Sequence, residues 1–182
     1  MGNARKRQGD KAELAAILYL AGLAPEHTVE RPRRVLGAGR RDDEGDILVF
    51  PGVAIQVKAW RELSGAIREA AIGAAQQAVN AERRYHLGLS KRHAARTDSW
   101  VASAASWPVS LDLAGIPVIG QTARAVSIVT SSVEPTTDRI VLVRRQGVPD
   151  LYVAHPDAWI TAWRTAVSAP ARSMGMSQLE AS

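Results

Sequence analysis

Three polar residues lie around a predicted β-hairpin at a spacing that could bind a divalent cation. Asp46 opens a short apolar run, and after a Pro-Gly turn signal Gln56 and Lys58 lie in a second, alternating run. Because successive strand residues point to opposite faces, Gln56 and Lys58 share one face. Carboxylate and amide oxygens are ligands for a hard cation. A neighbouring ammonium group could then orient water or stabilise charge on a phosphate.

Strand parity sets a condition on this site. If Pro51-Gly52 alone formed a two-residue turn, Asp46 would lie opposite Val57, on the wrong face for Gln56. A shared cation site therefore requires an odd-length loop, a β-bulge or a bend near Asp46. The alternative is an ordinary hairpin with Gln and Lys on its exposed face, which is a common arrangement.

This pattern, together with an upstream motif, resembles the PD-(D/E)XK nuclease superfamily, and within it most closely the Holliday junction resolvase branch. The upstream motif is Arg-Gln-Gly-Asp-Lys-Ala-Glu-Leu at residues 7–14, which is similar to that branch's basic residue, glycine and first-helix glutamate. The resemblance implies Mg²⁺ or Mn²⁺ as cofactor and an endonuclease activity on DNA, acting on Holliday junctions or other branched DNA. The site residues that it implies are Glu13, Asp46, Gln56, Lys58 and the backbone carbonyl of Val57.

In this resemblance Lys58 is the catalytic lysine and the other site residues are metal ligands. Gln56 departs from the usual pattern, in which most members have an acid. A glutamine contributes one neutral oxygen, so the site has one formal negative charge less and is expected to bind metal more weakly. Two alternatives stay open: another nuclease of the superfamily, of restriction or repair type, and a DNA-binding module with a decayed site.

The positive charge of the chain fits a DNA partner. The net charge is +5, and basic residues crowd the region before Asp46. Such a surface neutralises phosphates without reading bases, although any single arginine could simply be solvated. The predicted DNA contacts are Arg7, Lys11, Arg31, Arg33, Arg34, Arg40 and Arg41.

Two polar residues are second-tier site candidates. Gln77 lies on a predicted long helix, and in related nucleases a polar residue of this helix approaches the site; an exposed glutamine is the alternative. Glu30 lies on the predicted first strand, where a solvated side chain is the alternative. The acidic residues at 42–44 are interpreted as solvated loop charges.

Composition excludes several other classes. The chain has 182 residues, no cysteine and four dispersed histidines, which rules out disulfides and thiolate zinc sites and argues against histidine-metal nucleases. No apolar run is long enough to span a bilayer, and the N-terminus is polar and basic, so a cytoplasmic location without a membrane partner is expected.

The order of predicted elements indicates an α/β sandwich with a mixed central sheet, and the resemblance makes it restriction-endonuclease-like. Residues 1–167 are expected to form one domain, with core motifs at 7–85, an uncertain insertion or extension at 88–124 and a flexible tail at 168–182. A homodimer is implied, since a four-way junction is cut on two strands. The predicted elements are a helix at 10–23, a strand at 28–35, a hairpin at 46–60, a helix at 62–85, a basic loop at 91–96, strands at 99–104, 125–131, 139–144 and 151–154, and a helix from 157.

Overall fold

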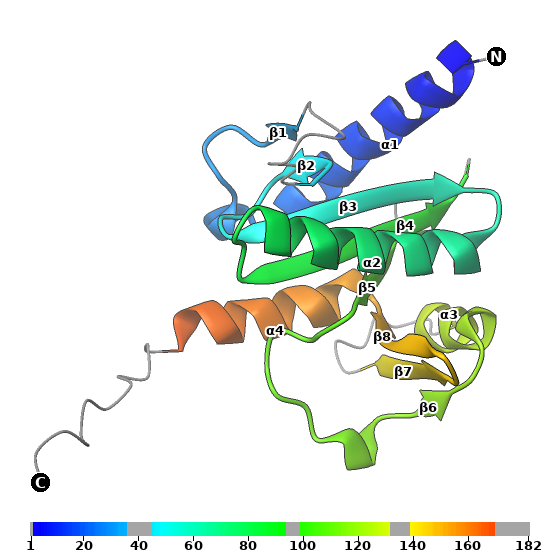
Figure 1. Cartoon of the computed structure of the whole chain (residues 1–182). Helices are drawn as coiled ribbons and strands as arrows, with labels where there is room; N and C mark the ends of the chain where they lie inside the picture. Colours follow the sequence, from blue (N-terminus) through cyan, green and yellow to red (C-terminus); the bar gives the residue numbers. More distant parts are fainter. Residues whose placement is uncertain (1, 36–44, 94–98, 132–138, 170–182) are drawn as a thin grey trace, which may run out of the picture.

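The structure is a computed structural model that describes residues 2–35, 45–93, 99–131 and 139–169. Its α/β character is as predicted, with four α-helices and one eight-stranded sheet in these ranges (Figure 1). The helices are α1 (Gly2–Leu23), α2 (Leu63–Asn80), α3 (Thr122–Thr130) and α4 (Pro156–Ser168). The strands are β1 (Arg33–Arg34), β2 (Ile47–Leu48), β3 (Val53–Trp60), β4 (Tyr85–Arg92), β5 (Val101–Ala104), β6 (Val118–Ile119), β7 (Ile140–Arg145) and β8 (Val148–Ala154).

The sheet is mixed, with the strand order β1-β2-β3-β4-β5-β8-β7-β6. β3 and β4 are parallel, as are β6 and β7, whereas the other neighbouring strands are antiparallel. Parallel neighbours need a crossover connection, and α2 supplies it between β3 and β4. The predicted α/β architecture with a mixed sheet is therefore confirmed.

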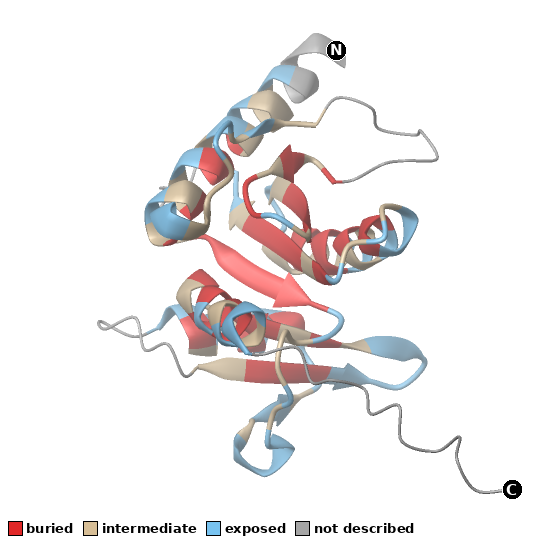
Figure 2. Ribbon diagram, turned by 90° about the vertical axis from the view of Figure 1, so that its left-hand side faces the viewer, coloured by how far each residue is buried: buried red, intermediate tan, exposed pale blue. Residues whose placement is uncertain are grey.

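Helices cover both faces of this sheet. One hydrophobic cluster joins α1 and α4 to the first face and contains Leu20 and Trp163. A second cluster joins α2 and α3 to the other face and contains Ile67 and Val129. Alternate residues of β5 belong to different clusters, as the two-residue period of a strand requires. Figure 2 shows the buried residues concentrated in the sheet and on helix surfaces that pack against it.

α3 corrects one prediction, because the sequence predicted a strand at 125–131. Its buried residues Thr122, Ala125 and Val129 recur at helical spacing, and the helix packs on β7. A short run rich in β-branched residues fits a strand or a buried helix equally well. The spacing of its apolar residues therefore does not decide between these two elements. Packing against the sheet selects the helix here.

The ends of two helices also differ from prediction. α1 begins at Gly2 instead of residue 10, so Asp10 is an internal helix residue. α2 was predicted to reach residue 85, but it ends at Asn80 because the chain reverses at Glu82, whose φ of 51° is left-handed. The next residues then form β4.

Two further predictions differ from the structure. The segment 28–35, which Pro32 was expected to limit to an edge or bulged strand, is reduced to the edge strand Arg33–Arg34. The basic loop predicted at 91–96 begins inside β4, and its residues 94–96 lie outside the described ranges.

The uncertain region 88–124 contributes strands to the same sheet, and α4 extends to Ser168, one residue into the expected tail. The rest of that tail, from residue 170, lies outside the described ranges. Among the described helices, none is long and apolar enough to cross a membrane.

Gly88 lies at a close approach between α2 and β4, and this approach generates a stability prediction. A Cβ at this position would lie 2.6 Å from both the Ala71 nitrogen and the Ser103 hydroxyl. We expect Gly88→Ala to lower the free energy of unfolding by about 1–3 kcal/mol, because backbone atoms would have to shift. Urea denaturation would measure the loss.

The matched control is Gly115→Ala, since a Cβ there meets nothing within 4 Å. It should change the free energy of unfolding by less than about 0.5 kcal/mol. Equal effects of the two substitutions would contradict the close packing of α2 on β4.

Candidate functional site

The register between β2 and β3 meets the condition for bringing Asp46 to Gln56. Ile47 pairs with Ile55, so the connection is centred on Pro51 and Asp46 lies opposite Gln56. The chain also bends just before β2, where Gly45 adopts a φ of 117° and forms a bridge with Ile55. A Cβ on Gly45 would lie 2.8 Å from the Ile55 oxygen, so only glycine fits this bend without a shift.

The Asp46 carboxylate bonds directly to β3. Its Oδ2 accepts a hydrogen bond of 2.7 Å from the Val57 N–H and another from the Gln56 side-chain nitrogen. β2 begins at Ile47, so the carboxylate takes the place that a longer strand would fill beside Val57. These bonds hold the carboxylate and the amide together at the edge of the sheet.

α2 covers the other side of the Gln56 amide. A Cβ at Gly73 would lie 2.8 Å from Gln56 Oε1, so this glycine leaves the space that the amide occupies. Gln77 lies one turn further along α2. Its side chain is buried, whereas the alternative interpretation was an exposed, solvated glutamine. Its Oε1 has no hydrogen-bond partner among the described residues.

Glu13 is held by an ion pair on the α1 side of the sheet. Arg34 donates its Nε to Glu13 and its Nη2 to Asp10. Partial burial raises the pKa of Glu13, the Arg34 hydrogen bond opposes this, and repulsion from Asp46 and Asp10 adds to it. Glu13 therefore lies within electrostatic reach of Asp46, although its direct partner is Arg34.

Lys58 follows Gln56 on the same face of β3 and is half-buried. The N-terminal part of α1 reaches this end of the strand, because Gln8 donates to the Ala59 carbonyl at 3.3 Å. Exposed Arg7 and Lys11 lie on the turns of α1 beside Gln8. The end of β3 that carries Lys58 is therefore close to basic residues of α1.

The other predicted DNA contacts have different environments. Arg31 and Arg33 are exposed, and Arg34 is committed to its two carboxylates. Arg40 and Arg41 lie outside the described ranges. Glu30 is exposed in the bend before β1 and has no hydrogen bond or ion pair to the site within the described part of the chain.

Sequence analysis missed three contributors to this arrangement. Asp10 and Glu13 are three residues apart on α1 and share a face, a spacing that could have revealed the pair. Arg34 was assigned to DNA, and only the fold shows its pairing with α1. No sequence signal indicated that Gly73 would face Gln56.

The donor types suit a hard cation, but the carboxylates are few. Within the described ranges, no three His, Cys, Asp or Glu side chains are grouped to hold a metal ion. A cation beside Asp46 would therefore need the Gln56 oxygen or a backbone carbonyl as well.

Comparison of the chain with protein-family models, curated proteins and solved structures finds no match.

The Arg34 ion pairs generate a prediction about stability. Arg34→Ala would leave Glu13 repelled by Asp10 and Asp46 without the guanidinium that offsets this repulsion, so we expect a loss of about 1–3 kcal/mol in the free energy of unfolding at pH 7. Urea denaturation would measure it.

Exposed Arg33 supplies the control. Arg33→Ala should change the free energy of unfolding by less than about 0.5 kcal/mol, because no ion pair involves Arg33 among the described residues. If Arg34→Ala were as mild as Arg33→Ala, the α1 carboxylates would not depend on Arg34.

Proposed function

We propose that this chain is a Mg²⁺- or Mn²⁺-dependent endodeoxyribonuclease of the PD-(D/E)XK type that acts on branched DNA. The observation that carries the proposal is the contact between Asp46 and Gln56, which the register of β2 and β3 creates. Lys58 lies on the same face, and Glu13 is within electrostatic reach of Asp46. The helices on both faces of the mixed sheet are compatible with a restriction-endonuclease-like fold.

The residues fit a hard divalent cation with two rearrangements, a turn of the Gln56 amide and the release of Glu13 from Arg34. Asp46 and Glu13 supply carboxylates and the Val57 carbonyl supplies a further oxygen. Gln56 turns its amide nitrogen towards Asp46, so a half-turn of the amide would present Oε1 to the same place. A bound Mg²⁺ would lower the pKa of a water ligand and neutralise charge on the phosphate.

Lys58 contributes a charge that needs no rearrangement of the strand. Its ammonium would donate hydrogen bonds to the attacking water or to the phosphate oxygens as negative charge develops on them. Asp46 and Gln56 would hold the cation beside that ammonium, and β3, buried between its neighbours, fixes the spacing of Gln56 and Lys58.

Exposed cations around this end of β3 would bind the DNA backbone. Arg7 and Lys11 lie on α1, and Arg61 and Arg92, at the ends of β3 and β4, are also exposed. Phosphate contacts of this kind release counterions and give binding without base preference. The exposed cations therefore support a DNA substrate. A DNA substrate also agrees with the expected cytoplasmic location.

A four-way junction would need two such sites, so we propose a homodimer. Branched DNA is favoured over linear duplex by the resemblance of residues 7–14 and 46–58 to resolvases. Cleavage of a synthetic four-way junction beside a linear duplex of matched sequence, with Mg²⁺, Mn²⁺ or chelator, tests both activity and substrate. Equal cleavage of both would favour a restriction or repair nuclease, and binding without cleavage would favour a DNA-binding module.

Lys58→Ala should reduce the cleavage rate by about 10²–10³-fold, because it removes a preorganised donor to the developing charge. Single-turnover cleavage of the four-way junction would measure the rate. Junction binding should stay close to wild type, since the other cations remain. A Lys58→Ala protein that cleaves normally would remove Lys58 from the mechanism.

Gln56→Glu separates a cation site from a purely structural contact. Without metal, a second carboxylate would face Asp46 in place of a donated hydrogen bond, so we expect a loss of about 1–3 kcal/mol in stability. With millimolar Mg²⁺ the loss should be recovered, because the added carboxylate strengthens cation binding and binding stabilises the fold. Thermal unfolding with Mg²⁺ or chelator would measure both effects.

The control for this experiment is the double variant that also carries Asp46→Asn. It lacks the carboxylate that the cation needs, so Mg²⁺ should stabilise it much less. A Gln56→Glu protein whose stability does not respond to Mg²⁺ would refute a cation site between these residues.

A further inference from the structure

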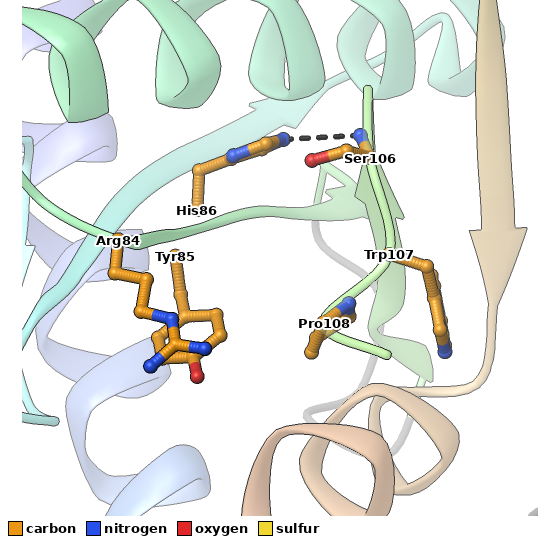
Figure 3. Close-up of a pocket in the computed structure, with 6 residues that line it drawn as sticks. All are labelled: Arg84, Tyr85, His86, Ser106, Trp107 and Pro108. Atoms are coloured by element: carbon orange, nitrogen blue, oxygen red, sulfur yellow. Dashed lines mark hydrogen bonds between the residues drawn. The ribbon is translucent and has the colours of Figure 1, made fainter. Parts of the chain in front are cut away.

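Two adjoining cavities lie at the end of the sheet where β4 begins. The first has a volume of about 150 Å³ and is lined by Arg84, Tyr85, His86, Ser106, Trp107 and Pro108 (Figure 3). The second has a volume of about 380 Å³ and is formed by the loop 105–111 and Tyr152. They share Ser106, Trp107 and Pro108, so the loop after β5 forms a wall of both.

These cavities are separate from the candidate metal site. Tyr85 pairs with Val53 at the start of the parallel strands, whereas Lys58 pairs with Ser90 near their far end. A ligand at the start of β4 would therefore bind without contacting Lys58.

Two buried donors of the first cavity have no partner. The Tyr85 hydroxyl and the Trp107 indole nitrogen are buried, and neither has a hydrogen-bond partner among the described residues. Tyr85 as a whole is only 8% exposed. Three other indole nitrogens, of Trp100, Trp159 and Trp163, also lack a partner among the described residues. Tyr85 belongs to the same hydrophobic core as these tryptophans and Trp107 packs against it, but Tyr85 and Trp107 also line the first cavity. A ligand with acceptor atoms would satisfy both groups.

The charge of the first cavity is positive. The Arg84 guanidinium lies over the Tyr85 ring, 5.2 Å from its centroid, and the side chain is exposed at the cavity (Figure 3). Burial lowers the pKa of His86, and its Nε2 accepts a hydrogen bond of 3.2 Å from the Ser106 N–H. The residues that line this cavity include no carboxylate, so it favours an anion.

The second cavity offers two aromatic rings, whose planes are inclined at 52° to each other. The Trp107 and Tyr152 rings are 5.8 Å apart between centroids and line it together. Its volume lies in the range of about 300–1,000 Å³ that small-ligand sites occupy. Nucleobases stack on such rings with little dependence on sequence.

We propose that these cavities bind a nucleoside phosphate, with the base against Trp107 and Tyr152 and the phosphate near Arg84 and the Tyr85 hydroxyl. Two kinds of ligand contain a nucleoside phosphate: a free mononucleotide and an unpaired nucleotide of a DNA strand. Binding needs neither a metal nor Lys58, so it stands or falls separately from the nuclease activity.

The test is equilibrium binding to the full chain in chelator, by isothermal titration calorimetry. The probes are thymidine 5′-monophosphate, thymidine, inorganic phosphate and a five-residue oligothymidylate. We expect the monophosphate or the oligonucleotide to bind more tightly than thymidine or phosphate alone, because both cavities are then occupied. Tight monophosphate binding assigns a free nucleotide, and binding of the oligonucleotide alone assigns a DNA strand.

Two variants and a control decide the location. Trp107→Ala should weaken binding by about 5- to 150-fold, as loss of a stacking platform does. Tyr85→Phe keeps the ring and the packing and should weaken binding several-fold through loss of the hydroxyl. Arg124→Ala, which removes an exposed cation of α3 away from the cavities, should leave binding unchanged.

Two outcomes would overturn the proposal. One is a wild-type protein that binds none of the four probes. The other is a Tyr85→Phe protein that retains wild-type affinity together with a folded Trp107→Ala protein that does the same, with folding checked by circular dichroism.

Discussion

The geometry at the open edge of the sheet depends on the two hydrogen bonds that the Asp46 carboxylate accepts from β3. One satisfies the Val57 N–H, which β2 is too short to pair, and the other fixes the Gln56 amide. Both require the register that sets Ile47 against Ile55. A shift of one residue would turn Asp46 to the opposite face and separate its carboxylate from the amide.

Charge balance around this edge is the second constraint. Glu13 and Asp10 come from α1, and Glu13 is repelled by both Asp10 and Asp46. Carboxylates so close repel one another, and the Arg34 guanidinium compensates by bonding to two of them. Arg34 thus keeps the acidic groups of α1 close to β3 in the protein without metal, and a cation bound there would compete for the same carboxylates.

The parallel strands β3 and β4 and the helix α2 between them form one packed unit. This unit carries the Asp46 region beside Gln56 of β3 and the aromatic cavities near the start of β4. α2 packs on both strands, with Gly73 against Gln56 and Gly88 against the helix backbone. These two glycines let the helix lie close to the strands, so the spacing of the strands is rigid. The Asp46 edge and the aromatic cavities are therefore held on one scaffold, at different positions along the same two strands.

The sequence by itself determined the α/β class, the hairpin with Asp46, Gln56 and Lys58, and the two helices whose apolar periods are long, α1 and α2. These follow from local rules, because period and turn chemistry act over a few residues. It failed at α3, where a short β-branched run fits either element.

Only the tertiary structure decided which long-range partners meet. The pairing of Arg34 with Glu13 and the approach of Gly73 to Gln56 join segments 21 and 17 positions apart in the chain. No local pattern encodes such contacts, since they arise when helices close on the sheet and bury its two faces. The same closure set Trp107 beside Tyr152 and left the Tyr85 hydroxyl, at a cavity, without a hydrogen-bond partner in the described part of the chain.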